Sequence, residues 1–258
     1  MQIAKKHLAE KNLVNKPMDT KPIIVVGFGN NGTRVACWYL QAFGVHIEHR
    51  NNMMDFPPAG KFAKKWLSQN IEGDLDMPKI HQDFKDMILP YIDEKVFEGI
   101  WGFKLAIGMA IPNILHELGA RIVHVIRDPR DVINSRKMQW ASVKAGEWGE
   151  KRSIDKLIPR SIEDLHERYN YIWAKVNMIC ADYCEKNMPD DYLRVRLEDL
   201  VLKKDDSLNA VANFLKTRLI ISRKKIEALD ENRLRKRMGK GNQSVKYAEI
   251  AMDRFGYL

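Results

Sequence analysis

An arginine and a serine lie eight residues apart in the segment 121–136, RIVHVIRDPRDVINSR. Arg127 follows a short β-branched run, and Ser135 lies about two helical turns further on. Asp128 is a typical N-cap residue and Pro129 suits the first helical position. The pattern predicts a buried strand, a tight turn and a helix. It places a guanidinium and a hydroxyl where open α/β sheets bind ligands, although a merely basic crossover would look the same.

A glycine-rich turn at residues 27–32, GFGNNG, is a second candidate anion site. It lies between an apolar run that predicts a buried strand (23–27) and a segment that predicts a mostly buried helix (33–44). Glycines let the backbone approach a phosphate, and the free amides of a helix N-terminus then face the anion. The G-x-G-x-x-G spacing is also the signature of dinucleotide binding.

Two neighbouring features bear on which nucleotide this turn would bind. Glu48 ends the next predicted strand (45–49), about where a ribose-binding carboxylate lies in dinucleotide-binding folds. Thr33 and Arg34 follow Gly32, so the turn lacks the Gly-Lys-Ser/Thr ending of a Walker P-loop. An NAD-dependent oxidoreductase is therefore an open alternative, whereas an ordinary nucleoside triphosphatase is disfavoured.

Strands and helices alternate along the rest of the chain. Further strands are predicted at 101–108 and 192–197, with helices between the strands. This alternation predicts a parallel sheet, because parallel strands need crossover helices. We expect an α/β protein with one domain, residues 21–258, whose central parallel sheet is flanked by helices. Residues 1–20 form a polar N-terminal extension without the apolar core of a secretory signal.

Several helix boundaries are also predicted. Ser161 and Asp164 have the spacing of a capping box that opens a long helix, and Asp205 or Asp206 would cap a later one. Residues 50–98 are irregular in pattern, with short helices expected near 62–70 and 81–94.

The overall charge favours an anionic partner. Lys and Arg total 43 against 34 Asp and Glu, a formal net charge of +9. The basic residues lack an aromatic-interleaved patch, so a nucleic-acid partner is not expected. No apolar run approaches the ~18 residues of a membrane span. The scattered Cys37, Cys180 and Cys184 predict a reduced, cytoplasmic protein without a metal site.

Four segments, in the same order, resemble the sulfotransferase family, which uses 3'-phosphoadenosine 5'-phosphosulfate. IIVVGFGNNGTRVACWYL resembles the family's 5'-phosphosulfate loop, and VIRDPRDVINS resembles its 3'-phosphate motif. LRVRLEDLVLKKDDSLNAVANFL is similar to its strand, Glu-Asp-Leu and helix segment. MGKGNQSVK resembles the basic glycine loop that closes on the 3'-phosphate. The resemblance implies a P-loop nucleotide-hydrolase-like sulfotransferase architecture.

The resemblance also implies which residues hold the sulfuryl donor. Around the 5'-phosphosulfate these are Gly29, Asn30, Asn31, Gly32, Thr33 and Arg34, and around the 3'-phosphate Arg127, Ser135, Lys240 and Gly241. The Asn31, Gly32 and Thr33 amides and the Thr33 hydroxyl are the expected donors to the phosphosulfate. A Rossmann dehydrogenase has no reason to carry Arg127 and Ser135 after a later strand, which disfavours the NAD alternative.

The catalytic positions depart from the family pattern. Asn30 stands where the family has Lys or Arg, so Arg34 or Lys104 would stabilise the charge on the leaving oxygen. Ala106 stands where cytosolic members have a general-base histidine, and Glu48 is the expected base instead. Nearby alternatives for the base are His46, His49 and Asp55.

The expected function is transfer of a sulfuryl group to a hydroxyl or amine of a small-molecule or glycan acceptor. Residues 50–98 and 138–160 are expected to shape the acceptor pocket. Three alternatives stay open: a non-catalytic sulfonucleotide-binding relative, an NAD-dependent oxidoreductase and a P-loop phosphotransferase.

Overall fold

The sheet at the centre of the molecule has five parallel strands in the order β2-β3-β1-β4-β5. The computed structural model describes residues 21–48, 57–72, 75–88, 100–133, 158–216, 238–239 and 245–258. The strands are β1 (Ile23–Val26), β2 (His46–Glu48), β3 (Trp101–Lys104), β4 (Arg121–Ile126) and β5 (Tyr192–Arg196). The predicted α/β fold with a central parallel sheet is confirmed. The expected extension, residues 1–20, lies outside the described part of the chain.

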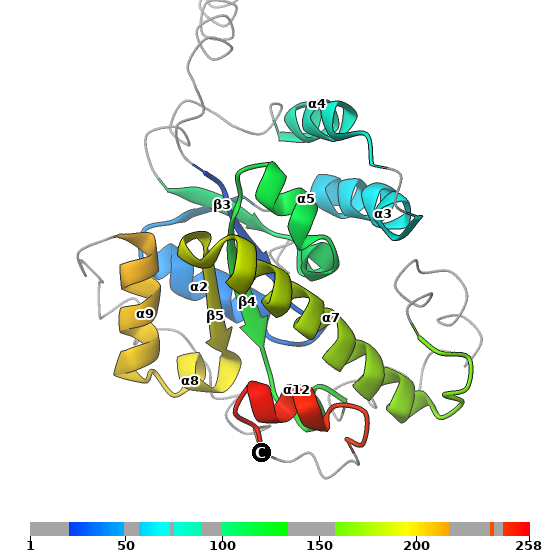
Figure 1. Cartoon of the computed structure of the whole chain (residues 1–258). Coiled ribbons are helices and arrows are strands. Elements are labelled where there is room, and N and C mark those ends of the chain that lie inside the picture. Colours follow the sequence, from blue (N-terminus) through cyan, green and yellow to red (C-terminus); the bar gives the residue numbers. More distant parts are fainter. Residues whose placement is uncertain are drawn as a thin grey trace, which may run out of the picture.

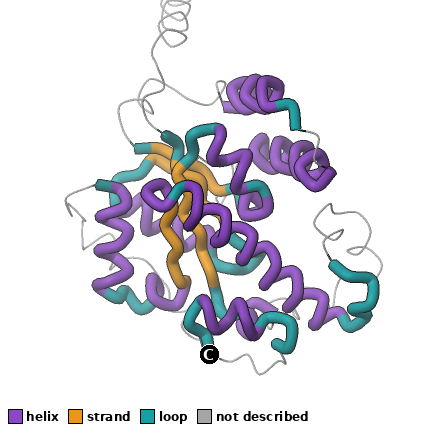
Figure 2. Tube along the Cα trace, viewed as in Figure 1, coloured by secondary structure: helices purple, strands orange, loops and turns teal. Residues whose placement is uncertain are grey.

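Helices lie on both faces of this sheet (Figure 1). In chain order the helical elements are α2 (Thr33–Ala42), α3 (Pro57–Glu72), α4 (Met77–Ile88), η3 (Ala106–Ala110), α5 (Pro112–Glu117), α7 (Leu165–Asn187), η5 (Pro189–Asp191), α8 (Leu197–Val201), α9 (Asp205–Leu215) and α12 (Glu249–Arg254). Figure 2 shows the strands in orange between the two helical layers.

Alternate residues of β1 belong to different halves of the core, because successive strand side chains point to opposite faces. Ile24 and Val26 pack in a cluster with α3, α4, α5, α7 and α12. Ile23 and Val25 pack in a second cluster with α2, α8 and α9. All four side chains are fully buried, as expected for a parallel strand covered on both faces. The sheet is therefore a rigid base for the loops at its ends.

The connections bring the two candidate anion sites to one edge of the sheet. From β1 the chain passes through α2 to β2, and from β3 it passes through α5 to β4, on the other side of β1. Because β1 and β4 are parallel neighbours, the turn after β1 and the turn after β4 leave the sheet side by side. Ligands bind at such a switch point in open α/β sheets.

The predicted capping box at Ser161 and Asp164 is wrong. Helix α7 begins at Leu165, and Asp164 is its N-cap, whose Oδ1 accepts a hydrogen bond of 2.9 Å from Glu167 N. Ser161 belongs instead to a separate turn, in which Ile162 N donates to Pro159 O. The capping motif is therefore Asp-x-x-Glu, three residues later than predicted.

Two other helix boundaries differ from the sequence expectation. The N-cap of α9 is Lys204. The two aspartates expected as caps lie in its first turn, where their negative charges interact favourably with the positive end of the helix dipole. Helix α3 has 16 residues and starts at the proline pair that suggested irregular chain. Proline suits the first turn of a helix because its missing N–H has no intrahelical partner there.

Candidate functional site

The turn after β1 forms an uncapped helix N-terminus. Asn30 and Gly32 have positive φ angles of 73° and 85°, which reverse the chain before α2 begins at Thr33. Gly32 is the N-cap, and no side chain caps the helix. The first amides of a helix have no partner within it and attract an anion, so this turn has the properties of a phosphate-binding loop.

The glycines of this turn also allow close packing against the rest of the fold. A Cβ atom on Gly32 would lie 2.5 Å from Leu197 Cδ1, and one on Gly27 would lie 2.7 Å from Val125 O. Both distances are shorter than a van der Waals contact. The two glycines thus let the turn approach α8 and β4 directly.

Asn31 fixes the turn to β4. Its side chain is fully buried, and its Nδ2 donates a hydrogen bond of 2.9 Å to Val125 O. Its backbone N–H donates to Phe28 O within the turn, at 2.9 Å, so the expectation that this amide binds the phosphosulfate is not supported. The Oδ1 atom is buried without a partner among the described residues, and an anion would not satisfy it.

Arg127 joins the turn after β4 to the turn after β1. Its side chain is 4% exposed, and its Nη1 donates a hydrogen bond of 3.2 Å to Asn30 O. Among the residues that the structure describes, Arg127 Nε and Asn30 Nδ2 are buried donors without a hydrogen-bond partner. Buried donors are rarely left unsatisfied, and a phosphate would satisfy both. Ser135, the expected second ligand, lies outside the described residues.

Asp128 caps the helix that follows Arg127, as predicted. Its Oδ1 accepts from Arg130 N at 2.8 Å, and Val132 N donates to Asp128 O at 3.0 Å in the first helical turn. The Arg130 side chain binds the same carboxylate, with its Nη2 2.6 Å from Asp128 Oδ2. This hydrogen bond raises the pKa of Arg130, so the guanidinium stays charged.

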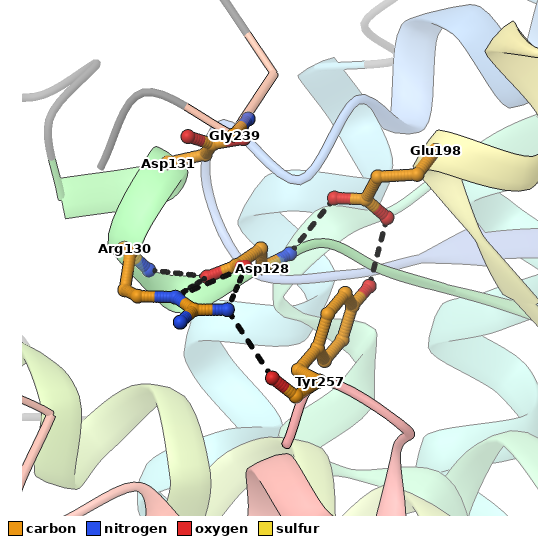
Figure 3. A network of polar contacts seen from close by, with 6 residues as sticks. All are labelled: Asp128, Arg130, Asp131, Glu198, Gly239 and Tyr257. Atoms are coloured by element: carbon orange, nitrogen blue, oxygen red, sulfur yellow. Dashed lines mark hydrogen bonds and ion pairs between the residues drawn. The ribbon is translucent and has the colours of Figure 1, made fainter. Parts of the chain in front are cut away.

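Glu198 contacts the turn after β4, and the sequence predicted no role for it. It is the second residue of α8, two residues after the end of β5, and its Oε1 accepts from Asp128 N at 3.0 Å. Its Oε2 accepts from the Tyr257 hydroxyl at 2.9 Å (Figure 3). Burial raises the pKa of the Glu198 carboxyl, although the hydrogen bonds and the Arg127 charge oppose the shift. The Glu-Asp-Leu sequence at a strand's carboxyl end was the available signal.

Asp131 brings a further segment to the same place. Its side chain is 2% exposed, and its Oδ2 accepts from Gly239 N at 2.8 Å. Gly239 directly precedes Lys240 and Gly241, which were expected to close over the 3'-phosphate and lie outside the described residues. Five segments thus meet at the carboxyl end of β4: the turns after β1 and β4, the start of α8, Gly239 and the residues after α12.

The expected catalytic side chains lie on the other side of β1. Lys104 ends β3 beside Val25 of β1. Glu48 ends β2 beside Phe103, and the His46 Nε2 atom lies 3.4 Å from Glu48 Oε2. Neighbouring strands are about 5 Å apart, so Glu48 lies two strands, about 10 Å, from β1. Both residues are at the carboxyl edge of the sheet.

Arg34 is less well placed to act on a leaving oxygen. It lies in the first turn of α2, but its guanidinium carbon lies 5.2 Å from the centre of the Trp38 ring. Trp38 is one turn further along the helix, away from the uncapped amides. The Arg34 side chain is therefore directed away from the helix N-terminus, whereas Lys104 ends the strand next to β1.

The described residues contain neither a cluster of metal ligands nor a membrane-crossing helix. In that part of the chain, no three or more His, Cys, Asp and Glu side chains gather in a way that could hold a metal ion. Of the helices described, none combines the length and the hydropathy needed to cross a membrane.

Comparison with known proteins yields one family match. Residues 111–220 match the model of the sulfotransferase family, and this segment includes the Arg127 turn, β5 and Glu198. No curated protein sequence matches the chain at a significant level.

Solved sulfotransferase structures have a similar fold. The sulfotransferase domain of the Synechococcus PCC 7002 olefin synthase has a TM-score of 0.56 at 15% identity, over 95% of this chain and 98% of that domain. The domain from the curacin biosynthetic pathway gives 0.50 at 15% identity, over 78% and 75%. A Mycobacterium avium sulfotransferase gives 0.51 at 12% identity, over 98% and 80%. These likenesses confirm the expected P-loop-like sulfotransferase architecture.

Proposed function

We propose that this chain, whose resemblance to the sulfotransferase family extends to both sequence and fold, transfers a sulfuryl group from 3'-phosphoadenosine 5'-phosphosulfate to an acceptor hydroxyl or amine. The observation that carries the proposal is Arg127, a buried arginine that binds the carbonyl of Asn30 while its Nε has no partner among the described residues. Such an arginine at the crossing of two ligand loops is suited to a nucleotide phosphate.

The 5'-phosphosulfate would bind at the N-terminus of α2. The amides of Gly32 and Thr33 and the Thr33 hydroxyl are the proposed donors, supported by the absence of a side-chain cap on this helix. Asn30 Nδ2 is an additional donor. Asn31 would act through the hydrogen bond of its side chain to β4, which holds the turn in place.

The 3'-phosphate would bind at the start of the helix after β4. Arg127 and Ser135 are the proposed ligands, and Lys240 and Gly241 would complete the site. The contact between Asp131 and Gly239 supports this arrangement, because it holds the start of the glycine loop beside the Arg127 turn.

The transfer itself requires a nucleophile and a leaving group. The acceptor oxygen or nitrogen attacks sulfur, the bond from sulfur to the 5'-phosphate oxygen breaks, and 3',5'-adenosine bisphosphate leaves with an additional negative charge. Glu48 would take the acceptor proton, and Lys104 would stabilise the leaving oxygen, which is the electrostatic role that the family gives to its loop cation. Arg34 stays a second candidate for that role if its side chain leaves Trp38.

The acceptor is proposed to be a small molecule, with a glycan as the broader possibility. Two of the similar structures are domains of a biosynthetic pathway and of an olefin synthase, which supports a small-molecule acceptor. We also propose a cytoplasmic location, supported by Cys37, Cys180 and Cys184, which are buried and form no disulfide bond.

A non-catalytic sulfonucleotide-binding protein is the second candidate. It is favoured by Asn30, whose amide carries no charge where the family has a lysine or arginine, and by the position of Arg34 over Trp38. Such a protein would bind 3',5'-adenosine bisphosphate and yet transfer nothing. Turnover of the sulfonucleotide with a panel of acceptors separates the two candidates.

The donor assignment is tested by calorimetric titration with 3',5'-adenosine bisphosphate, NAD and ATP. We expect binding of the bisphosphate in preference to the other two, and a loss of about a hundredfold or more in Arg127→Ala, because a charged hydrogen-bonded pair is removed from a buried site. Arg160→Ala, which removes an exposed arginine, is the matched control and should bind normally. Retained affinity in Arg127→Ala would refute the 3'-phosphate site, and preference for NAD would support the oxidoreductase.

A further inference from the structure

The register of the sheet brings Asp128 and Glu198 together. Ile126 of β4 lies beside Arg196 of β5, and the two acids each lie two residues beyond this pair. The backbone N–H of Asp128 therefore reaches the Glu198 carboxylate, 3.0 Å from Oε1. This N–H belongs to the residue that directly follows Arg127. Its hydrogen bond fixes the peptide plane from which the Arg127 side chain extends.

Tyr257, in the segment after α12, contacts three residues at this place: Glu198 of α8, Arg130 of the turn after β4, and Arg196 at the end of β5. Its hydroxyl donates to Glu198 Oε2 at 2.9 Å, and its carbonyl oxygen accepts from Arg130 Nη2 at 3.2 Å (Figure 3). The guanidinium carbon of Arg196 lies 4.3 Å from the centre of its ring. The tyrosine is 8% exposed, so these contacts are formed away from water.

Both oxygens of the Glu198 carboxylate are thus occupied by donors from different segments. Burial raises the pKa of this carboxyl, and the positive charge of Arg127 opposes that shift because it stabilises the carboxylate. A core that only needed packing would not place a carboxylate here, because a buried charge is costly unless it is fully hydrogen-bonded. The arrangement instead fixes the backbone that carries the phosphate-binding arginine.

We propose that Glu198 and Tyr257 are positioning residues for recognition of the 3'-phosphate: Glu198 holds the Asp128 amide, and Tyr257 holds Glu198. This inference rests on the proposed function, since it concerns the site of Arg127. It adds two residues that touch no part of the nucleotide, and it gives the segment after α12 a role in donor binding.

The test compares two ligands, 3',5'-adenosine bisphosphate and adenosine 5'-monophosphate, which lacks the 3'-phosphate. The measured quantity is the dissociation constant of the monophosphate divided by that of the bisphosphate, in the wild type and in folded variants. We expect this ratio to fall by about tenfold in Glu198→Ala and by about threefold in Tyr257→Phe, the sizes expected for the loss of two and one hydrogen bonds. Glu198→Gln keeps an acceptor for the Asp128 amide and should restore most of the ratio.

Tyr192→Phe is the matched control for Tyr257→Phe. It also removes one hydroxyl from a hydrogen bond, of 2.8 Å to His124 Nδ1, but at the amino end of β5. It should lower the melting temperature without changing the ratio, whereas a general loss of stability would affect both tyrosine variants alike.

The outcomes separate the inference from the function on which it rests. A wild-type ratio near one means that the 3'-phosphate is not recognised, and the proposed function then fails together with the inference. A large wild-type ratio that Tyr257→Phe leaves unchanged overturns the inference alone. If Glu198→Ala does not fold, Tyr257→Phe and Glu198→Gln still decide, because one should lower the ratio and the other should keep it.

Discussion

At the scale of single residues, the proposed donor-binding residues and the proposed catalytic residues differ in burial and in hydrogen bonding. Arg127 is buried, bonded to Asn30 O and still has an unsatisfied Nε among the described residues, which is the condition of a ligand group. Glu48 lies on the edge strand β2, where its Oε2 atom is 3.4 Å from Nε2 of His46, a side chain that is 53% exposed. The binding of the donor is therefore the better-defined half of the proposed reaction.

Replacement of Glu48 by glutamine tests the general base. Glu48→Gln keeps the shape of the side chain and removes its basicity, so we expect turnover to fall by about a hundredfold or more while bisphosphate affinity is unchanged. Sulfonucleotide turnover is measured with an acceptor that the wild type sulfates, and Glu163→Gln, an exposed change before α7, is the matched control.

The neighbouring histidine provides the contradicting outcome for this prediction. If Glu48→Gln retains turnover and His46→Gln loses it, His46 is the base, and the carboxylate only orients the ring.

At the scale of elements, two helix N-termini show two different uses of the same backbone groups. Helix α7 is capped by Asp164, whose carboxylate accepts a hydrogen bond from the Glu167 amide. Its negative charge also interacts favourably with the positive end of the helix dipole. Helix α2 has no side-chain cap, although it begins next to the sheet edge where ligands bind. An uncapped N-terminus at that position leaves its amides for an anion.

The cap of α7 can be tested by one pair of substitutions. We expect Asp164→Ala to lower the free energy of unfolding by about 1 kcal/mol, because it removes an N-cap hydrogen bond. Ser161→Ala is the matched control and should have almost no effect, since Ser161 lies in the preceding turn. Urea unfolding measures both variants, and a larger loss in Ser161→Ala would restore the capping box that the sequence suggested.

At the scale of the whole molecule, a buried polar bridge joins the sheet to its longest described helix. His124 of β4 accepts at Nδ1 from the Tyr192 hydroxyl and donates from Nε2 to Asn177 Oδ1, both at 2.8 Å. Asn177 Nδ2 then donates to Trp173 O within α7. Burial lowers the pKa of His124 from 6.5 to about 4, so the imidazole is neutral in the folded protein.

This bridge makes the stability dependent on pH in a defined direction. In the unfolded chain His124 has a pKa of 6.5, so it binds a proton below that pH. In the folded protein its pKa is about 4, so between pH 6.5 and pH 4 only the unfolded chain is protonated there, and acidification favours unfolding. We expect this histidine alone to lower the free energy of unfolding by about 2 kcal/mol between pH 7 and pH 5. Urea unfolding measures the free energy of unfolding at the two pH values, and its change from pH 7 to pH 5 should be smaller in His124→Gln than in the wild type. An equal change in both proteins would contradict the attribution of this pH dependence to His124.

The sequence predicted the parts of the fold that depend on local patterns. The β-branched runs within 23–27 and 121–126 predicted β1 and β4, because strands buried on both faces are mostly apolar along their whole length. The cap at Asp128 was also predicted correctly, since its hydrogen bond lies within two residues. The start of α7 was predicted three residues too early, at Ser161 instead of Asp164, because two capping spacings overlap there and only the backbone path distinguishes them.

The contact of Glu198 with Asp128 and Tyr257 could not be predicted from the sequence. Their partner Asp128 lies 70 residues from Glu198, and Tyr257 lies 59 residues from Glu198, so no local pattern connects them. Their meeting depends on the parallel pairing of β4 with β5 and on the path of the chain after α12. Long-range contacts of this kind follow from topology and not from residue type.

The sequence by itself determined the chemistry available to this protein: a glycine turn before a helix, an arginine after a strand, and a family resemblance that unites them. Those features are local, because strand burial, helix caps and turn residues act over a few positions. Only the tertiary structure decided that Arg127 contacts Asn30, that Asn31 holds its turn to β4, and that Arg34 lies over Trp38. These facts depend on strand order and register, which bring distant residues together at one edge of the sheet.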